Sequence, residues 1–205
     1  MGGADLIYDW NRLPGCFDYS GVDVELDDET LRDGLQNPSV TDPPVERKVE
    51  LLHLMADLGI HAADIGLPGA GPRARKSTEV LAREIAEQDL PIEANCAART
   101  VRADIEPIAE IAQATGLRLE VGAFIGSSPI RRYAEDWEPE MLRKATREAV
   151  SFAVGEGLDV MYVTEDTTRS RPETLRELYT LAIESGARRI CLADTVGHAT
   201  PHGVR

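Results

Sequence analysis

The amino-acid sequence predicts an α/β fold with a parallel sheet that forms most, but not all, of a (β/α)8 TIM barrel. From Val22 onward, short apolar or β-branched runs alternate with helical patterns at a spacing of about 30–40 residues, the size of one βα unit. Polar residues follow most of the apolar runs. In a barrel these strand ends meet on one face, whereas in an open doubly wound sheet they meet only at the switch point. The polar strand ends therefore favour the barrel over the open sheet.

Six segments have the pattern of strands, and helical patterns lie between them. The strand candidates are 24–28, 62–66, 91–95, 119–125, 158–164 and 190–193. Apolar residues at steps of three and four predict helices around 45–55, 80–85, 105–111, 141–152 and 175–181. Ser77 is predicted to cap the second helix, residues 170–173 have the pattern of a capping box, and Thr200-Pro201 can start a last helix.

The length of the chain fits about six of the eight βα units of a barrel. Residues 24–205 divide into six units of about 30 residues, whereas a closed barrel has about 250 residues in all. The sequence therefore predicts an N-terminal extension at residues 1–22 and a partial barrel domain at residues 23–205. The two missing units would leave two unpaired sheet edges.

Composition and charge exclude several classes of protein. The 205 residues carry a formal net charge of −14, which argues against binding to nucleic acid or to an anionic membrane. The hydrophobic content of 42% is too high for a disordered chain, and no apolar run is long enough to span a membrane. The three cysteines are odd in number and far apart, which favours the reducing cytoplasm over a disulfide framework.

The segment 28–36 is the richest in groups that can do chemistry. It follows the first strand candidate and reads Asp-Glu-Thr-Leu-Arg-Asp-Gly-Leu-Gln. The carboxylate of Asp33 can hold a divalent cation, and the neighbouring Arg32 can bind a carboxylate or stabilise an oxyanion. The simpler interpretation is an Arg–Asp surface pair in a turn, which contributes little to stability.

Five motifs in this sequence resemble, in order, those of the 2-isopropylmalate synthase and homocitrate synthase family. This pyruvate carboxyltransferase-like group also contains HMG-CoA lyase. Residues 28–36 resemble its opening signature Asp-x-Thr-Leu-Arg-Asp-Gly-x-Gln. Residues 64–71 resemble the segment after the second strand, and residues 124–130 the segment after the fourth. Residues 164–170 and 194–201 are similar to the Glu-Asp-x-x-Arg and Asp-Thr-Val-Gly-x-x-x-Pro segments after the fifth and sixth strands.

The resemblance implies a metal-dependent acyltransferase with its site at the C-terminal face of a TIM barrel. In such synthases a divalent cation (Mg, Mn or Zn) holds a 2-keto acid, acetyl-CoA is enolised and attacks the keto carbon, and the thioester is hydrolysed. By the same resemblance Asp33 is the metal ligand, and Arg32 and Glu165 belong to the catalytic set. The implied substrate-binding residues are Gln36, Asp64, Ser127, Ser128 and Thr195. Asp166 and Arg169 are expected to form a structural pair or a helix cap.

The sequence departs from the family pattern in ways that leave two alternatives open. The chain stops before the His-x-His pair of the seventh strand, and Gly122 stands where the synthases usually have His. Asp64 replaces a Glu, and Leu35 followed by Gln36 and Asn37 matches the HMG-CoA lyase form of the signature. The alternatives are a carbon–carbon lyase acting on a 3-hydroxyacyl-CoA and a non-catalytic truncated barrel.

The missing histidines lead to an expectation about partners. We expect the chain alone to be inactive, as a fragment or as one part of a split enzyme. Its expected partners are a 2-keto acid, an acyl-CoA, and either further copies of itself in a homo-oligomer or a complementing C-terminal chain. His198 and His202 are four residues apart and can in principle share a metal, although the polarity of an exposed loop explains them as well.

Overall fold

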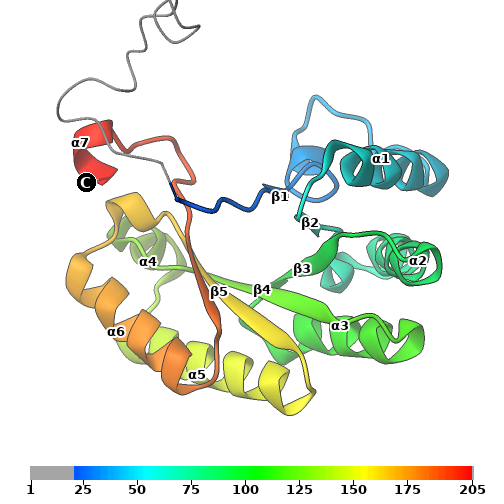
Figure 1. Cartoon of the computed structure of the whole chain (residues 1–205). Coiled ribbons are helices and arrows are strands. Elements are labelled where there is room, and N and C mark those ends of the chain that lie inside the picture. The colour runs from blue at the N-terminus through cyan, green and yellow to red at the C-terminus, as the bar shows by residue number, and fades with distance from the viewer. Residues whose placement is uncertain (1–20, 205) are drawn as a thin grey trace, which may run out of the picture.

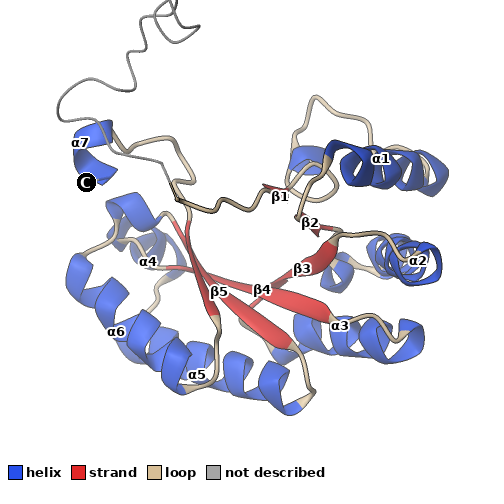
Figure 2. Cartoon of the chain, in the orientation of Figure 1, coloured by secondary structure: helices blue, strands red, loops and turns tan. Residues whose placement is uncertain are grey.

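The computed structural model describes residues 21–204, which form one sheet covered by helices on one side. The six strands are parallel and follow the order β1-β2-β3-β4-β5-β6, so that each strand pairs with the next along the chain. Figures 1 and 2 show a curved, open sheet with the helices on its outer side, which is the arrangement of a half-barrel. The predicted partial barrel is confirmed. Most of the predicted extension, residues 1–20, lies outside the described residues.

All six predicted strands are present, but their bounds differ from the prediction, most of all for β1 and β3. The strands are β1 Asp27–Asp28, β2 Ala62–Asp64, β3 Glu93–Arg99, β4 Leu119–Gly126, β5 Asp159–Glu165 and β6 Arg189–Leu192. Strand β1 is shorter than the predicted 24–28, because only its last two residues pair with β2. Strand β3 continues to Arg99, so Asn95, which was expected at a strand end, lies inside the strand.

The helices follow the predicted periodicity, and two of them end at glycines in the left-handed conformation. They are α1 Val45–Leu58, α2 Pro72–Gln88, α3 Arg102–Thr115, α4 Pro129–Glu135, α5 Pro139–Gly155, α6 Pro172–Glu184 and α7 Pro201–Val204. Gly59 closes α1 with φ 76°, and Gly116 closes α3 with φ 71°. The helix α4 was not predicted, because its polar sequence was assigned to the loop after β4.

Two predicted helix caps are wrong. Ser77 does not cap α2, because that helix already begins at Pro72 and Ser77 lies within it. Ser170 does not cap α6, whose N-cap residue is Arg171. The Ser170 hydroxyl instead donates to the Asp166 carbonyl (3.0 Å) and hydrogen-bonds the Ser127 hydroxyl (2.7 Å). The predicted cap at the last helix is confirmed, since Thr200 Oγ1 accepts from the Gly203 amide (3.2 Å).

The hydrophobic core lies between the outer face of the sheet and the helices. Alternate residues of β3, β4 and β5 point outward and are buried, among them Cys96, Val121 and Val160. They meet apolar helix residues of which the largest are fully buried, namely Leu52, Leu81, Ile105, Ile108, Leu142 and Leu178. Each such side chain contributes about 1.5–3 kcal/mol when it is removed from water. The half-barrel therefore has a core of its own on the helical side.

One polar pair inside this core gives a first testable prediction. Tyr162 is buried on β5, and its hydroxyl bonds Thr146 Oγ1 (2.7 Å), which donates in turn to the Leu142 carbonyl (2.8 Å). We expect Tyr162→Phe to lower the free energy of unfolding by about 0.5–1.5 kcal/mol in chemical denaturation, because a buried hydrogen bond is lost. Tyr133→Phe is the control. Its parent side chain is 89% exposed, and a change within about 0.5 kcal/mol is expected.

Candidate functional site

The concave side of the sheet holds a pocket of about 430 Å³, the central pocket, at the carboxyl ends of the strands. Residues from all six βα units line it. Six of the eight predicted site residues are among them: Arg32, Asp33, Gln36, Asp64, Glu165 and Thr195. The barrel topology brings these residues together although they are up to 163 positions apart in the sequence.

The turn after β1 holds the signature segment in place through its own backbone. Asp28 Oδ1 accepts from the Thr30 amide (2.8 Å), and the Glu29 carbonyl accepts from the amides of Arg32 (3.3 Å) and Gly34 (3.0 Å). Leu31 is buried in the core. The turn is thereby anchored on its apolar side, while the next residue, Arg32, extends along the pocket.

Arg32 is held by three carboxylates. Its Nε donates to Asp64 Oδ2 (2.8 Å), Nη1 contacts Asp33 Oδ1 (3.1 Å) and Nη2 contacts Glu29 Oε2 (3.1 Å). Asp64 is buried and also accepts from the Gly66 amide (3.0 Å), which fixes its orientation. Burial opposes the charge of Arg32, but the three carboxylates outweigh this effect and raise its pKa. The guanidinium is therefore both charged and fixed.

The carboxylates of this cluster are themselves perturbed by burial. Burial, together with the charge of Asp64, raises the pKa of Glu29 to about 7. Burial also raises the pKa of Asp64 to about 6, although the charge and hydrogen bond of Arg32 act in the opposite direction. Above about pH 7, where Glu29 and Asp64 are both ionised, the three carboxylates exceed the single guanidinium in charge, which favours a bound cation at this end of the pocket.

The other predicted residues fall into two groups. Glu165 ends β5, and Thr195 follows β6, where its Oγ1 accepts from the Asp166 amide (2.8 Å). Ser127 and Ser128 do not line the pocket, and both are buried. Ser127 pairs with the hydroxyl of Ser170, and Ser128 Oγ accepts from the Arg131 amide (3.3 Å) at the start of α4. Both serines hold the turn after β4, away from Arg32.

Several pocket residues were missed by the sequence analysis. Glu29 lies within the signature itself, and Asn95, Met161 and Cys191 line the pocket from β3, β5 and β6. Alternation along the strand groups Asn95, Met161 and Cys191 with other residues of the same face, because each lies two positions from another pocket residue. Alternation does not say which of the two faces points inward, and this is visible only in the folded sheet.

The expected structural pair is confirmed in the segment after β5. Arg169 Nε and Nη2 donate to the two carboxylate oxygens of Asp166 (2.7 and 2.8 Å). These hydrogen bonds lower the pKa of Asp166. Asp166 follows Glu165 directly, so the pair fixes the end of β5, whose last residue, Glu165, lines the pocket.

The lowered pKa of Asp166 gives a second prediction. A depressed folded-state pKa stabilises the fold above the unfolded value of about 3.9, and this contribution is lost as the pH falls through the folded-state value. We therefore expect Arg169→Ala to melt below the parent protein near pH 7. The difference in melting temperature should shrink as the pH is lowered to about 2. A difference that stays constant over this range would show that the pair does not set the pKa of Asp166.

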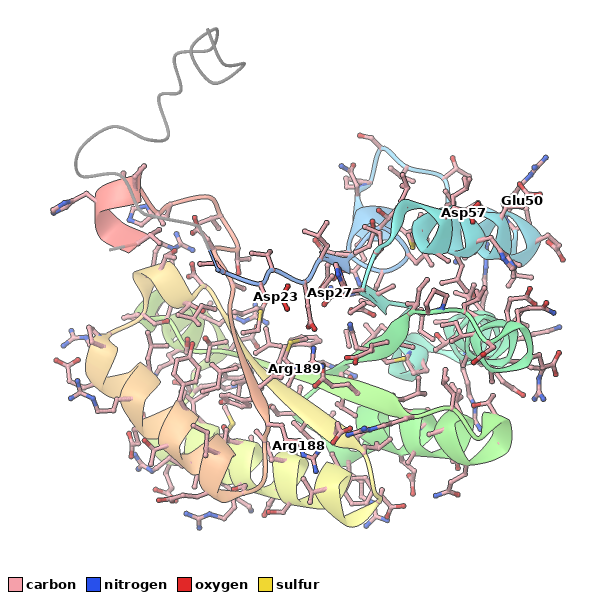
Figure 3. All side chains as sticks on the ribbon, in the orientation of Figure 1. Asp23, Asp27, Glu50, Asp57, Arg188 and Arg189 are labelled. Atoms are coloured by element: carbon pink, nitrogen blue, oxygen red, sulfur yellow. The ribbon has the colours of Figure 1, made fainter. Side chains whose placement is uncertain are left out.

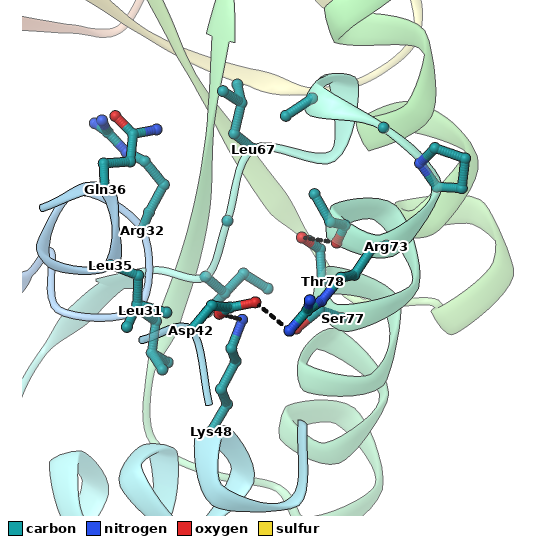
Figure 4. Close-up of a pocket in the computed structure, with 16 residues that line it drawn as sticks. Leu31, Arg32, Leu35, Gln36, Asp42, Lys48, Leu67, Arg73, Ser77 and Thr78 are labelled. Atoms are coloured by element: carbon teal, nitrogen blue, oxygen red, sulfur yellow. Dashed lines mark hydrogen bonds and ion pairs between the residues drawn. The ribbon is translucent and has the colours of Figure 1, made fainter. Parts of the chain in front are cut away.

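A second pocket of about 380 Å³ lies beside the signature segment, between it and the start of α2. Arg32 and Gln36 line both pockets. Figure 4 shows Asp42 between Lys48 and Arg73, with contacts of 2.6 Å to Lys48 Nζ and 2.7 Å to Arg73 Nη2. The apolar part of the wall comes mainly from four side chains, Leu31, Leu35, Ile65 and Leu67. The second pocket was not predicted from the sequence.

The described residues do not by themselves assemble a metal site. Within residues 21–204 there is no cluster of three His, Cys, Asp or Glu side chains that could hold an ion. Asp33 lines the pocket with one carboxylate, whereas His198 and His202 are exposed and do not line it. A divalent cation at Asp33 would therefore need further ligands from outside the described residues.

A curved parallel sheet with its polar site at the carboxyl ends of the strands defines a protein of the TIM-barrel type. None of the helices within residues 21–204 has the length and apolar character needed to cross a bilayer. A family model described as HMGL-like matches residues 23–205, and the chain belongs to this family. The resemblance found in the five motifs is thereby confirmed.

The chain spans less than half the length of the curated relatives described here. It is 37% identical over 179 residues to 2-isopropylmalate synthase of Pyrococcus abyssi, covering 87% of this chain and 36% of the relative. It is 33% identical to homocitrate synthase AksA of Methanopyrus kandleri, covering 89% of this chain and 44% of the relative. The crystal structure of HMG-CoA lyase from Bacillus subtilis superposes with a TM-score of 0.69 at 19% identity, covering 88% of this chain and 61% of that one. This last likeness shows the fold alone.

Proposed function

We propose that this chain carries the Arg32–Asp33 half of the active site of an acyltransferase that condenses acetyl-CoA with a 2-keto acid at a divalent metal. The observation that carries the proposal is the charged Arg32, fixed by Asp64 and Glu29 at the carboxyl end of a parallel barrel. Membership of the family supports it, as does the similarity to proteins named 2-isopropylmalate synthase and homocitrate synthase.

Arg32 is suited to stabilise the charge that forms in this reaction. The methyl carbon of the acetyl group forms a bond to the keto carbon, and the keto oxygen becomes an alkoxide. A guanidinium that is already fixed can donate to that oxygen without reorganising, and one such donor contributes about 2.7–4 kcal/mol. Glu165 lines the same pocket, and we assign it the proton that leaves the acetyl methyl group. Thr195 and Gln36 line the pocket as substrate contacts.

The second pocket is our candidate for the path of the acyl-CoA arm. It meets the central pocket at Arg32 and Gln36, so a thioester lying in it would reach the guanidinium. Its leucine side chains suit the apolar parts of a pantetheine chain. Lys48 and Arg73 place two cations opposite the single carboxylate of Asp42, which favours an anionic ligand.

Asp33 is the metal ligand that we assign to this chain, with the remaining ligands from units that close the barrel. Among the described residues, β1 and β6 each pair on one side only. Leu26, beside β1, is 55% exposed and Leu192, in β6, is 67% exposed. We propose that two further βα units, from a continuation of the chain or from a partner, cover these edges. Without them the chain is expected to be inactive.

An assay of both reaction directions tests the proposal. The chain is combined with the units that close its barrel and supplied with Mg²⁺ or Mn²⁺. Release of the coenzyme A thiol from acetyl-CoA is followed in the presence of pyruvate, 2-oxoisovalerate or 2-oxoglutarate. Thiol release that depends on one of these acids supports the synthase. Cleavage of 3-hydroxy-3-methylglutaryl-CoA instead would establish the lyase, which Leu35 and Asn37 favour, and inactivity in both assays would favour the non-catalytic barrel.

A further inference from the structure

We propose that Gly122 sets the length of the 2-keto acid side chain that the central pocket accepts, by leaving an apolar recess between β3 and β5. The inference rests on the proposed function, because it takes for granted that the pocket binds a 2-keto acid. Beyond that function, it identifies the side chain of the keto acid as the part that is recognised and Gly122 as the residue that limits its size.

The central pocket is polar at one end and apolar further along the strands. The polar end contains the Arg32 cluster and Glu165, where the carboxylate and keto groups of the substrate would bind. Along the strands the lining is mainly apolar: Ala97 and Met161 pair with Gly122, and Phe124, Val163, Cys191 and Ala193 lie on its carboxyl side. A keto acid held at the polar end would therefore direct its side chain along this apolar surface.

Gly122 is not required by the backbone or by close packing. It lies in the middle of β4, paired with Ala97 on β3 and Met161 on β5, and it is not among the glycines with positive φ. A Cβ built on it would be 3.7 Å from the Cys96 carbonyl oxygen, and 3.8 Å from both Ala97 Cα and Met161 Cε. These are ordinary van der Waals distances. The absent side chain therefore leaves volume that belongs to the pocket.

A charged layer near the amino ends of the strands limits the recess. Two positions before Gly122, Glu120 pairs with Arg189 (3.3 Å), which also contacts Glu93 (2.7 Å). Asp27 accepts hydrogen bonds from Asn95 Nδ2 (3.0 and 3.2 Å), and Figure 3 shows Asp27 and Arg189 on the concave side of the sheet. Carboxylates exceed cations in this layer, so a second carboxylate on the substrate would be repelled. The recess fits an apolar chain of limited length.

Alkylation of Cys191 measures occupancy of the recess without any need for activity. Cys191 lines the pocket as a half-buried free thiol, whereas Cys96 is fully buried. The full chain, combined with the units that close its barrel, is treated with iodoacetamide in the presence of Mg²⁺, and modification of the Cys191 peptide is followed by mass spectrometry. The ligands are pyruvate, 2-oxobutanoate, 2-oxopentanoate, 2-oxohexanoate and 2-oxoglutarate.

The expected result is a dependence of protection on side-chain length. The apparent Kd should fall by about fourfold for each added methylene until the chain reaches the charged layer. Pyruvate should protect least among the monocarboxylic acids, and 2-oxoglutarate should not protect at concentrations at which 2-oxopentanoate does.

Variants at Gly122 test whether this residue sets the length. Gly122→Ala, whose methyl group meets only ordinary contacts, should reduce the gain in affinity per added methylene. Gly122→Val should remove this gain in affinity, while pyruvate still protects Cys191. Met161→Ala should extend the gain in affinity to longer acids. Gly155→Ala, at the end of α5 with open space around it, is the control and should match the parent protein.

Two outcomes would overturn the inference, and they can be told apart. If pyruvate protects and the Gly122→Val variant shows the same length dependence as the parent protein, Gly122 does not limit the substrate and the proposed function is untouched. If no keto acid protects Cys191 in any variant, the pocket does not bind 2-keto acids, and the proposed function is contradicted together with the role of Gly122.

Discussion

Replacing Asp33 with alanine is expected to abolish the metal-dependent activity of the barrel-closed enzyme while leaving the fold intact. The Asp33 side chain is 68% exposed, and its contact with Arg32 Nη1 is 3.1 Å. An exposed ion pair of this kind contributes about 0–1 kcal/mol to stability. Arg32 keeps its hydrogen bond to the buried Asp64, so the guanidinium should stay in place. The loss would therefore be one of metal binding.

Two measurements separate this role from a structural one. Metal titration of activity should show no response to Mg²⁺ or Mn²⁺ in Asp33→Ala, and the melting temperature should stay within a few degrees of the parent value. Asp57→Ala is the matched control, because it also removes an exposed carboxylate, from α1 and outside both pockets (Figure 3). Metal-dependent activity that survives in Asp33→Ala would contradict the assignment of Asp33 as a ligand.

Hydrophobic periodicity predicted the strands and helices because each βα unit is a local pattern, and the polar strand ends then distinguished the barrel from an open sheet. The strand at 119–125 and the helix around 45–55 were predicted correctly from spacing alone. The prediction of the cap of α6 failed, because side-chain hydroxyls can form hydrogen bonds with distant partners instead of the nearby helix. Ser170 has the sequence context of an N-cap, but its hydroxyl bonds Ser127, a residue 43 positions away, and no local pattern contains that partner.

The site was predicted where topology alone determines it. Arg32, Asp64 and Glu165 follow or end parallel strands, so the barrel places them at one end whatever their rotamers. Ser127 also follows a strand, but the structure turns it toward the loop after β5 rather than into the pocket. The second pocket depends on the contact of Asp42 with two helices, which is a tertiary feature without a sequence signature.

The turn that carries Asp64 gives the largest effect that we expect on stability. Gly66 has φ 149°, its amide donates to Asp64 Oδ1 (3.0 Å), and its carbonyl accepts from the Ala97 amide (3.0 Å). A Cβ at this position would overlap Oγ1 of the buried Thr78, which bonds the Ala74 carbonyl (3.0 Å). We expect Gly66→Ala to lower the free energy of unfolding by about 2–5 kcal/mol in chemical denaturation, from backbone strain and overlap together.

Two further variants divide this loss between its causes. Gly71 has a similar φ of 138° but open space around a built Cβ, so Gly71→Ala should show the strain alone, about 1–3 kcal/mol. In the double variant Gly66→Ala/Thr78→Ala the overlapping oxygen is gone, and the nearest remaining Thr78 atom, Cβ, is 3.6 Å away. The double variant should therefore be more stable than Gly66→Ala, with a coupling energy of about 1–3 kcal/mol. Additive losses would mean that Thr78 is not what requires glycine beside Asp64.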